Sequence, residues 1–188
     1  MLILAVGAKG GVGTTRFVEV LVRSARLVGL DAADGALAAR LGWATYPLDR
    51  VVGWGERRLM QEAQRLARRR PVLLWNAVCD TFPQPLRLVE MVARLGSVVV
   101  DGGIEPPDAL WKAAGHGFIV SLDDPAALYH ETYLKAQWSK AHGGAGIIRA
   151  VVGNVEEAAR ALARDWFGAE VRPPKAPAFL RGVGIKFK

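Results

Sequence analysis

A glycine-rich run near the N-terminus limits the possible folds of this chain more than any other feature. It reads Ala8-Lys9-Gly10-Gly11-Val12-Gly13-Thr14-Thr15. It follows the apolar stretch Leu2–Val6, and a helical spacing of apolar residues runs over Thr14–Arg23. A strand, a tight glycine turn and a helix N-terminus together direct backbone N–H groups to one point, where they bind phosphate oxygens. The run therefore predicts a phosphate-binding loop, in which the Thr15 hydroxyl would bind Mg²⁺.

Further short apolar runs alternate with helical patterns along the chain. The apolar runs predict buried strands at Arg26–Leu30, Val72–Trp75, Val98–Val100, Gly117–Val120 and Ile147–Val152. The helical patterns lie at Glu56–Arg70, Gln84–Leu95, Ala126–Lys140 and Val155–Trp166. This alternation predicts an α/β fold: a doubly wound, mainly parallel sheet with helices on both faces. Ligands bind beyond the carboxyl ends of the strands in such sheets, which is where Lys9, Asp31 and Asp101 are expected.

The chain has the length of one domain, at 188 residues. We expect a nucleotide-binding domain over residues 1–172 and a basic tail, rich in proline and glycine, over residues 173–188. The tail is expected to run extended over the surface. An amphipathic membrane helix is the alternative, but Pro173 and Pro174 at its start and two later glycines argue against one.

Composition restricts the compartment and the partners. The single cysteine, Cys79, excludes an internal disulfide framework and fits a reducing cytoplasm. No uncharged apolar run approaches the roughly 20 residues that span a bilayer, so we expect no transmembrane segment. The formal net charge of +7 favours an anionic partner, which could be nucleotide, nucleic acid or anionic lipid.

The string KGGVGTT resembles the deviant Walker A motif, KGGxGK[ST], of the ParA/MinD family of P-loop ATPases, a SIMIBI-like class of P-loop NTPase. Lys9 matches the signature lysine of that family, which reaches the phosphates of the nucleotide in the opposing subunit of a sandwich dimer. Thr14 stands at the second lysine position, which resembles the CpaE/TadZ pilus-assembly branch. The resemblance implies ATP and Mg²⁺ as ligands and a homodimer as the active form.

Other segments extend the resemblance from Leu2 to about Arg172. Asp31-Ala32-Ala33-Asp34 falls where the family carries its DxD segment, and the stretch after it resembles the CpaE sequence GDLALALG. Val98-Val99-Val100-Asp101 resembles the Walker B strand, whose aspartate faces the water shell of the metal. Asn154 follows a strand at the position where family members often contact adenine. The implied metal ligands are thus Thr15 and Asp101.

Two departures from the family pattern concern catalysis. The aspartate that arranges the attacking water aligns with Ala33, unless Asp34 takes that role through a one-residue shift. Thr14 replaces the second lysine, and the loss of one charged contact to phosphate costs about 1.5–3 kcal/mol, or roughly 10- to 100-fold in affinity. Phosphoryl transfer depends on positioned positive charge and an oriented water. We therefore expect nucleotide binding with slow or absent hydrolysis, with Lys9, Asp31 and Asp34 as the candidate catalytic residues.

Each of these residues also has a purely structural interpretation. The glycine run could be a turn that binds nothing, and Asp101 could cap the turn that follows it. Asp31 could satisfy backbone N–H groups at the strand end, and Asn154 could be the N-cap of the helix that follows. Arginines crowd the helix at residues 56–70, where they could dock nucleic acid or lipid or could simply be solvated. They are Arg57, Arg58, Arg65, Arg68, Arg69 and Arg70.

Three functional hypotheses follow. The first is an ATP-binding switch, a weak or degenerate ATPase whose nucleotide-dependent dimer positions or assembles a larger complex such as pilus or secretion machinery. The second is a pseudo-ATPase scaffold that uses the fold only for protein contacts, which Ala8, Thr14 and Ala33 favour. The third is a DNA-associated partition-type protein, which the net charge and the arginine-rich helix favour.

Overall fold

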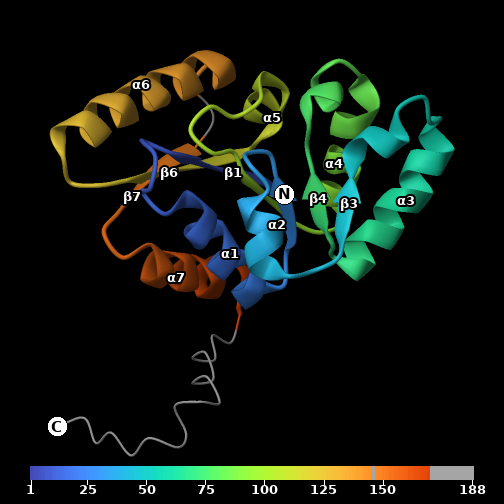
Figure 1. Cartoon of the computed structure of the whole chain (residues 1–188), viewed down its shortest axis with the longest axis horizontal. Helices are drawn as coiled ribbons and strands as arrows, with labels where there is room; N and C mark the ends of the chain where they lie inside the picture. Colours follow the sequence, from blue (N-terminus) through green and yellow to red (C-terminus); the bar gives the residue numbers. More distant parts are fainter. Residues whose placement is uncertain (145–146, 170–188) are drawn as a thin grey trace, which may run out of the picture.

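The computed structural model describes residues 1–144 and 147–169, which form one parallel sheet with helices on both faces (Figure 1). Its strands are β1 (Leu2–Gly7), β2 (Val28–Asp31), β3 (Thr45–Pro47), β4 (Val72–Leu74), β5 (Val98–Asp101), β6 (His116–Ser121) and β7 (Ile147–Val152). They lie in the order β3-β4-β2-β5-β1-β6-β7, and every neighbouring pair is parallel. The expected α/β class and doubly wound parallel sheet are confirmed.

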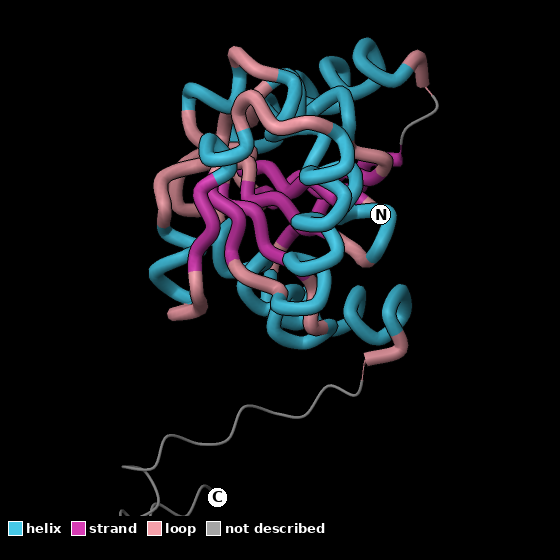
Figure 2. The backbone as a smooth tube through the Cα atoms, turned by 90° about the vertical axis from the view of Figure 1, so that its right-hand side faces the viewer, coloured by secondary structure: helices cyan, strands magenta, loops and turns pink. Residues whose placement is uncertain are grey.

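The helices divide between the two faces of the sheet, as the layered view in Figure 2 shows. They are α1 (Thr14–Ala25), α2 (Ala36–Leu41), α3 (Glu56–Arg69), α4 (Pro83–Leu95), α5 (Asp108–Ala113), α6 (Pro125–His142) and α7 (Val155–Phe167), with 3₁₀ turns at Leu48–Val51 and Ala77–Asp80. Side chains of α3, α4, α5 and α6 share one hydrophobic cluster, and those of α1, α2 and α7 share the other.

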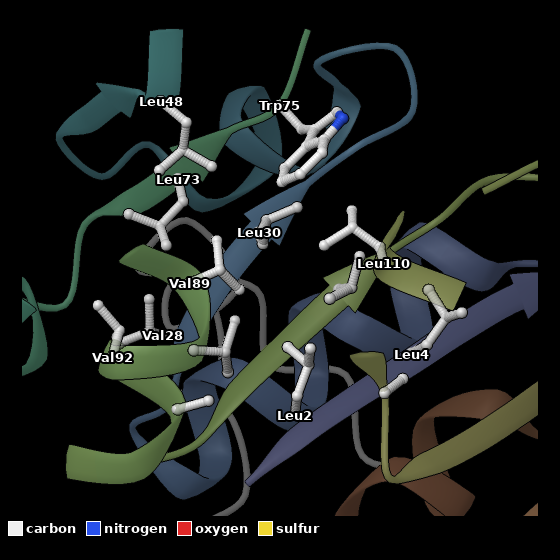
Figure 3. Packing of buried hydrophobic residues seen from close by; sticks show 14 of the residues in the cluster. Leu2, Leu4, Val28, Leu30, Leu48, Leu73, Trp75, Val89, Val92 and Leu110 are labelled. Carbon is white, nitrogen blue, oxygen red and sulfur yellow. The ribbon is translucent and has the colours of Figure 1, made fainter. Parts of the chain in front are cut away.

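The alternation of side chains along β1 connects the two clusters. Leu2 and Leu4 point into the first cluster, while Ile3 and Ala5 point into the second. Figure 3 shows Leu2 and Leu4 in the first cluster, with Val89 of α4 and Leu110 of α5 packed on the same side. A strand that is buried on both faces explains why the sequence of β1 is continuously apolar.

Most differences from the expected elements concern short segments. The sequence patterns missed β3, α2 and α5, which have three, six and six residues. Such segments are too short to show a period of two or 3.6 residues. The second strand begins at Val28 rather than Arg26, because Arg26 takes a left-handed conformation (φ 53°) and ends α1 instead.

The expected tail at residues 173–188 lies outside the described residues, so its extended course stays a prediction. Within the described part of the chain, no helix combines the length and the apolar character needed to cross a bilayer.

The topology places three loops together at the carboxyl edge of the sheet. Strand β5 lies between β1 and β2, so the residues that follow these three strands are neighbours in space. The amide of Gly7 donates to Gly103 O at 2.7 Å, and the amide of Ala32 donates to Asp101 O at 3.0 Å. This edge is where the candidate site residues gather.

Candidate nucleotide-binding site

The loop between β1 and α1 has the backbone conformation of a phosphate cradle. Gly11 (φ 77°) and Gly13 (φ 95°) both occupy the left-handed region, which residues with a Cβ rarely adopt. Gly13 is the N-cap of α1 and supplies no capping side chain, and the first turn of the helix carries no acidic residue. Amides in the first turn of α1 are thus left for an external acceptor, and the helix dipole favours an anion there.

Thr14 turns into the protein instead of toward that cradle. Its side chain is buried, and a Cβ at Gly7 would lie only 2.7 Å from Thr14 Oγ1. Gly7 is therefore needed for Thr14 to pack beneath the loop. The position that carries a lysine in the general Walker pattern contributes no positive charge here.

Asp101 ends β5 with a carboxylate that is fully buried and only half satisfied. Its Oδ1 accepts from the amide of Gly103 at 3.3 Å, while Oδ2 has no hydrogen-bond partner among the described residues. Burial raises the pKa of Asp101, although the Thr15 hydroxyl and the Gly103 amide oppose that shift. An orphaned carboxylate oxygen beside a threonine hydroxyl is the oxygen-rich donor set that Mg²⁺ prefers. The residues present therefore fit a magnesium ion.

Asp31 lies at the same register on the neighbouring strand β2, and both of its carboxylate oxygens accept hydrogen bonds from backbone amides. Its Oδ1 accepts from the amides of Ala33 (3.3 Å) and Gly35 (3.1 Å), and its Oδ2 accepts from the amide of Ala38 (3.1 Å). The structure thus confirms that Asp31 satisfies backbone N–H groups, while a catalytic role for Asp31 stays a prediction. Its carboxylate holds the loop after β2 and the first turn of α2.

Ala33 and Asp34, later in this loop, differ in whether they offer a carboxylate oxygen. Asp34 is exposed, and its Oδ1 accepts from the amide of Ala36 at 3.1 Å, which leaves its Oδ2 on the surface. Ala33 lies against the loop after β5, because a Cβ at Gly103 would be 3.1 Å from the Cβ of Ala33. Ala33 thus supplies close packing at a position where the resemblance to the DxD segment would place a carboxylate. A catalytic role for Asp34 stays a prediction.

Lys9 forms an ion pair within its own chain. Its Nζ lies 2.6 Å from Oδ2 of Asp124, and both side chains are partly exposed. Asp124 is also the N-cap of α6, where its Oδ1 accepts from the amide of Ala127 at 3.0 Å. The ammonium group of Lys9 holds the pKa of Asp124 below its usual value.

Helix α6 makes a second contact with the loop, through Nδ1 of His130 and the carbonyl oxygen of Ala8. The sequence patterns pointed to neither Asp124 nor His130 as part of this site, since both lie more than 110 residues after the loop. The only available signal was the pair Asp124-Pro125, which is typical of a helix start.

Asn154 lies at the N-terminus of α7, where its side chain accepts from the amide of Glu157 at 3.2 Å. The structure thus confirms its N-cap role, while contact with a base stays a prediction. The same turn adjoins the glycine loop, because a Cβ at Gly13 would be 3.3 Å from the side chain of Val155. Arg16 of α1 pairs with Glu156 at 2.8 Å and fastens the two helices together.

The arginine-rich helix α3 lies at the β3 end of the sheet, away from the loop (Figure 1). Part of its charge is occupied within the chain. Arg65 pairs with Glu62, and the guanidinium of Arg58 lies 3.7 Å from the ring centre of Trp54. Arg57, Arg69 and Arg70 are exposed.

Comparison with known proteins finds likeness only at the level of structure. No family model and no curated protein matches the sequence. The ATP complex of McdA from Cyanothece superposes with a TM-score of 0.54 at 14% identity, covering 88% of this chain and 78% of McdA. A plasmid partition protein from Borrelia burgdorferi gives 0.49 at 10% identity, over 84% of this chain and 82% of its own.

A third solved structure, shikimate kinase from Acinetobacter baumannii, superposes more loosely still. Its TM-score is 0.35 at 14% identity, over 87% of this chain and 90% of the kinase. In this chain, the all-parallel sheet and the glycine loop after β1 agree with the likeness to McdA. The chain therefore shares the α/β fold of McdA.

Proposed function

We propose that this protein is a switch that binds Mg-ATP in the loop from Lys9 to Thr15, dimerises when it does so, and hydrolyses ATP slowly or not at all. The observation that carries the proposal is the orphaned, buried Oδ2 of Asp101 beside Thr15, at the foot of a loop with two left-handed glycines. A buried carboxylate oxygen without a partner is costly, and a metal ion would offset that cost.

The residues would divide the ligand between them. The amides of the loop and the first turn of α1 would hold the phosphates, and Thr15 and Asp101 would hold Mg²⁺. Bound Mg²⁺ neutralises charge on the phosphate oxygens. Val155, which adjoins Gly13, and the preceding Asn154 would border the base.

Dimerisation would depend on Lys9, which would contact the nucleotide phosphates bound in the opposing subunit. Lys9 lies at the exposed side of the loop, and its partner Asp124 is also on the surface. An exposed ion pair contributes little to stability, so the lysine can exchange its carboxylate partner for another anion. Lys9 would therefore leave Asp124 to reach the phosphates in a second subunit.

Hydrolysis would be weak for two reasons that the geometry supports. Thr14 is packed under the loop and brings no cation to the phosphates. Both oxygens of Asp31 accept from backbone amides, and Ala33 stands at the second aspartate position of the segment, so within this segment the exposed Asp34 is left to orient a water. Such a protein would act as its ATP-bound dimer, which would position or assemble a larger complex. Pilus or secretion machinery of the CpaE/TadZ kind is the proposed machine.

Isothermal titration with Mg-ATP and with Mg-GTP, followed by sedimentation velocity, tests the proposal. We expect heat on addition of Mg-ATP and a shift from monomer to dimer. Lys9→Ala should abolish the dimer, while Lys140→Ala, which removes the same charge from the exposed end of α6, should not. Thr14→Lys should strengthen binding about 10- to 100-fold if the lysine reaches the phosphates. Absence of heat in the wild-type protein would overturn the proposal.

A pseudo-ATPase scaffold is the second candidate, and the pairing of Lys9 with Asp124 favours it, because that pair occupies the cation that the switch requires. A thermal unfolding midpoint that does not change in millimolar Mg-ATP would support the scaffold. A ligand at 100 times its dissociation constant should add about 2.7 kcal/mol to the free energy of unfolding.

A DNA-associated role is the third candidate, and the exposed Arg57, Arg69 and Arg70 of α3 favour it. Binding through phosphates weakens steeply with salt. Retardation of duplex DNA at 200 mM salt, lost when these three arginines are changed to glutamine, would raise this role above the others.

A further inference from the structure

A small cavity adjoins the glycine loop on the side of α5 and α6, which lie next to each other in Figure 1. Its volume is about 210 Å³. It is lined by Ile104, Glu105, Pro106, Asp108, Trp111, His130, Tyr133, Leu134 and Gln137. We call it the α5/α6 pocket.

The α5/α6 pocket combines an apolar floor with an acidic rim. Trp111 and Leu134 are buried beneath it, while Glu105 and Asp108 are exposed at its edge. Among the described residues, no lysine or arginine lines it, although the chain as a whole carries a net charge of +7. Lys112 does not line the pocket, but its Nζ lies 4.0 Å from Oδ2 of Asp108 in an ion pair whose side chains are both largely exposed, so another cation can replace it. The pocket therefore complements a positive group.

The surface around the pocket is suited to a protein segment and not merely to a small cation. Large apolar side chains are exposed in the loop after β5, in the loop between β6 and α6, and on α6, in contrast to the charged surface of α3. They are Ile104, Leu122, Leu128, Tyr129 and Tyr133, with Tyr129 81% exposed. Of these, Ile104 and Tyr133 line the pocket itself. Exposed apolar groups beside a pocket are typical of contact with another macromolecule.

We infer that the α5/α6 pocket is the docking site for a basic segment of a partner protein, one arginine of which enters the pocket. The aliphatic stem of an arginine would cover Trp111 and Leu134, and its guanidinium would stack on Tyr133 and pair with Glu105 and Asp108. Arginine suits the site better than lysine, because a planar guanidinium both stacks on a ring and pairs with carboxylates.

The pocket also shares its walls with the proposed nucleotide site. Ile104 approaches Gly10 of the loop, where a Cβ would be 3.9 Å from its Cδ1, and His130 contacts Ala8. An occupant that shifts Ile104 or His130 would thus change the loop. This coupling rests on the proposed function, whereas the docking itself does not.

Fluorescence anisotropy with a labelled peptide tests the docking in the absence of nucleotide. The probe is Gly-Leu-Arg-Ala-Leu-Arg-Gly, and its control carries citrulline, which has the shape of arginine without the charge, in place of both arginines. We expect the arginine peptide to bind and the citrulline peptide to bind at least about 5-fold more weakly. Equal binding of the two peptides would overturn the inference.

Matched variants of the protein locate the binding. Glu105→Gln with Asp108→Asn should weaken binding about 5- to 20-fold. Glu157→Gln with Asp165→Asn removes the same charge from α7, which packs on the opposite face of the sheet, and should change binding less than about 2-fold. Equal losses in the two double variants would show attraction to net charge alone and would overturn the inference.

Two further readouts separate the alternatives. Tyr133→Ser should weaken the arginine peptide, because it removes the stacking surface. If the pocket instead receives a second copy of this chain, resonances of Trp111 and Gly10 will shift with protein concentration and not with peptide, which would overturn the inference. Repeating the titration with Mg-ATP tests only the coupling between the pocket and the loop. If the protein binds no nucleotide, the proposed function fails, while the peptide titration without nucleotide still decides the docking.

Discussion

Asp31 and Asp101 occupy the same register on adjacent parallel strands, are both buried, and yet differ in what their carboxylates do. Asp31 accepts three backbone hydrogen bonds, two from the loop after β2 and one from the first turn of α2, so its carboxylate holds these segments together. Asp101 accepts one and leaves an oxygen without a partner. In this protein, the aspartate at a strand end keeps an oxygen for a ligand only where the amides of the following loop do not donate to it.

The largest effect should come from removing the structural carboxylate. Asp31→Ala should lower the free energy of unfolding by about 3 kcal/mol, because three amides lose a charged acceptor. Urea denaturation monitored by tryptophan fluorescence measures the loss. Asp34→Ala is the control, since Asp34 is exposed and accepts a single bond, and it should cost less than about 1 kcal/mol. If the two variants unfold at the same urea concentration, the structural assignment of Asp31 is wrong.

Asp101 should show the opposite behaviour. In wild-type protein, Mg-ATP at 100 times its dissociation constant should add about 2.7 kcal/mol of stability, and Asp101→Asn should lose most of that gain. Thermal unfolding with and without Mg-ATP measures both values. A variant that keeps the full gain in the presence of Mg²⁺ would show that Asp101 does not hold the metal.

The same aspartate gives a pH dependence in the absence of ligand. Burial raises the pKa of Asp101 in the folded state, so the folded protein binds this proton more tightly than the unfolded chain does. Stability from this group is therefore present at low pH and is lost as pH rises through the raised pKa. Asp101→Asn should unfold at a higher temperature than wild type at pH 7, and the difference should shrink toward pH 4.

A smaller effect should come from the contact between the two loops. Gly103 has φ 62°, and a Cβ there would lie 3.1 Å from Ala33. Gly103→Ala should cost about 1–2 kcal/mol from the left-handed backbone, plus the cost of this close contact. Gly168→Ala is the matched control, because Gly168 has φ 59° with no described atom within 4 Å of the added Cβ. Equal losses would mean that the loops do not press on each other.

The smallest effect on stability should come from the pair of Lys9 and Asp124. Asparagine also caps helices, so Asp124→Asn should leave the urea midpoint unchanged. Lys9 lowers the pKa of Asp124 in the folded protein. The ion pair is therefore fully formed at pH values above the usual carboxyl pKa, and it is lost as the pH falls through the lowered pKa. The informative measurement is nucleotide affinity: freeing Lys9 with Asp124→Asn should strengthen Mg-ATP binding or leave it equal, and weaker binding would contradict the proposed transfer of Lys9.

Much of the architecture followed from residue patterns alone. A strand buried on both faces must be apolar at consecutive positions, and β1 and β5 were recognised on that basis, each with one residue of difference in its bounds. The turn after β1 was recognised because left-handed backbone at Gly11 and Gly13 requires glycine. Short pieces such as α2 escaped notice, because one and a half turns show no periodicity.

The roles of the charged residues depended on how distant segments meet. Asp31 and Asp101 look alike in sequence, each being an aspartate after an apolar run, and only the direction of the neighbouring amides separates them. The partner of Lys9 lies 115 residues away, brought near because β6 lies beside β1 in the sheet. Local patterns record the conformation of a few residues, whereas the state of a carboxylate or an ammonium group is set by every strand and helix packed around it.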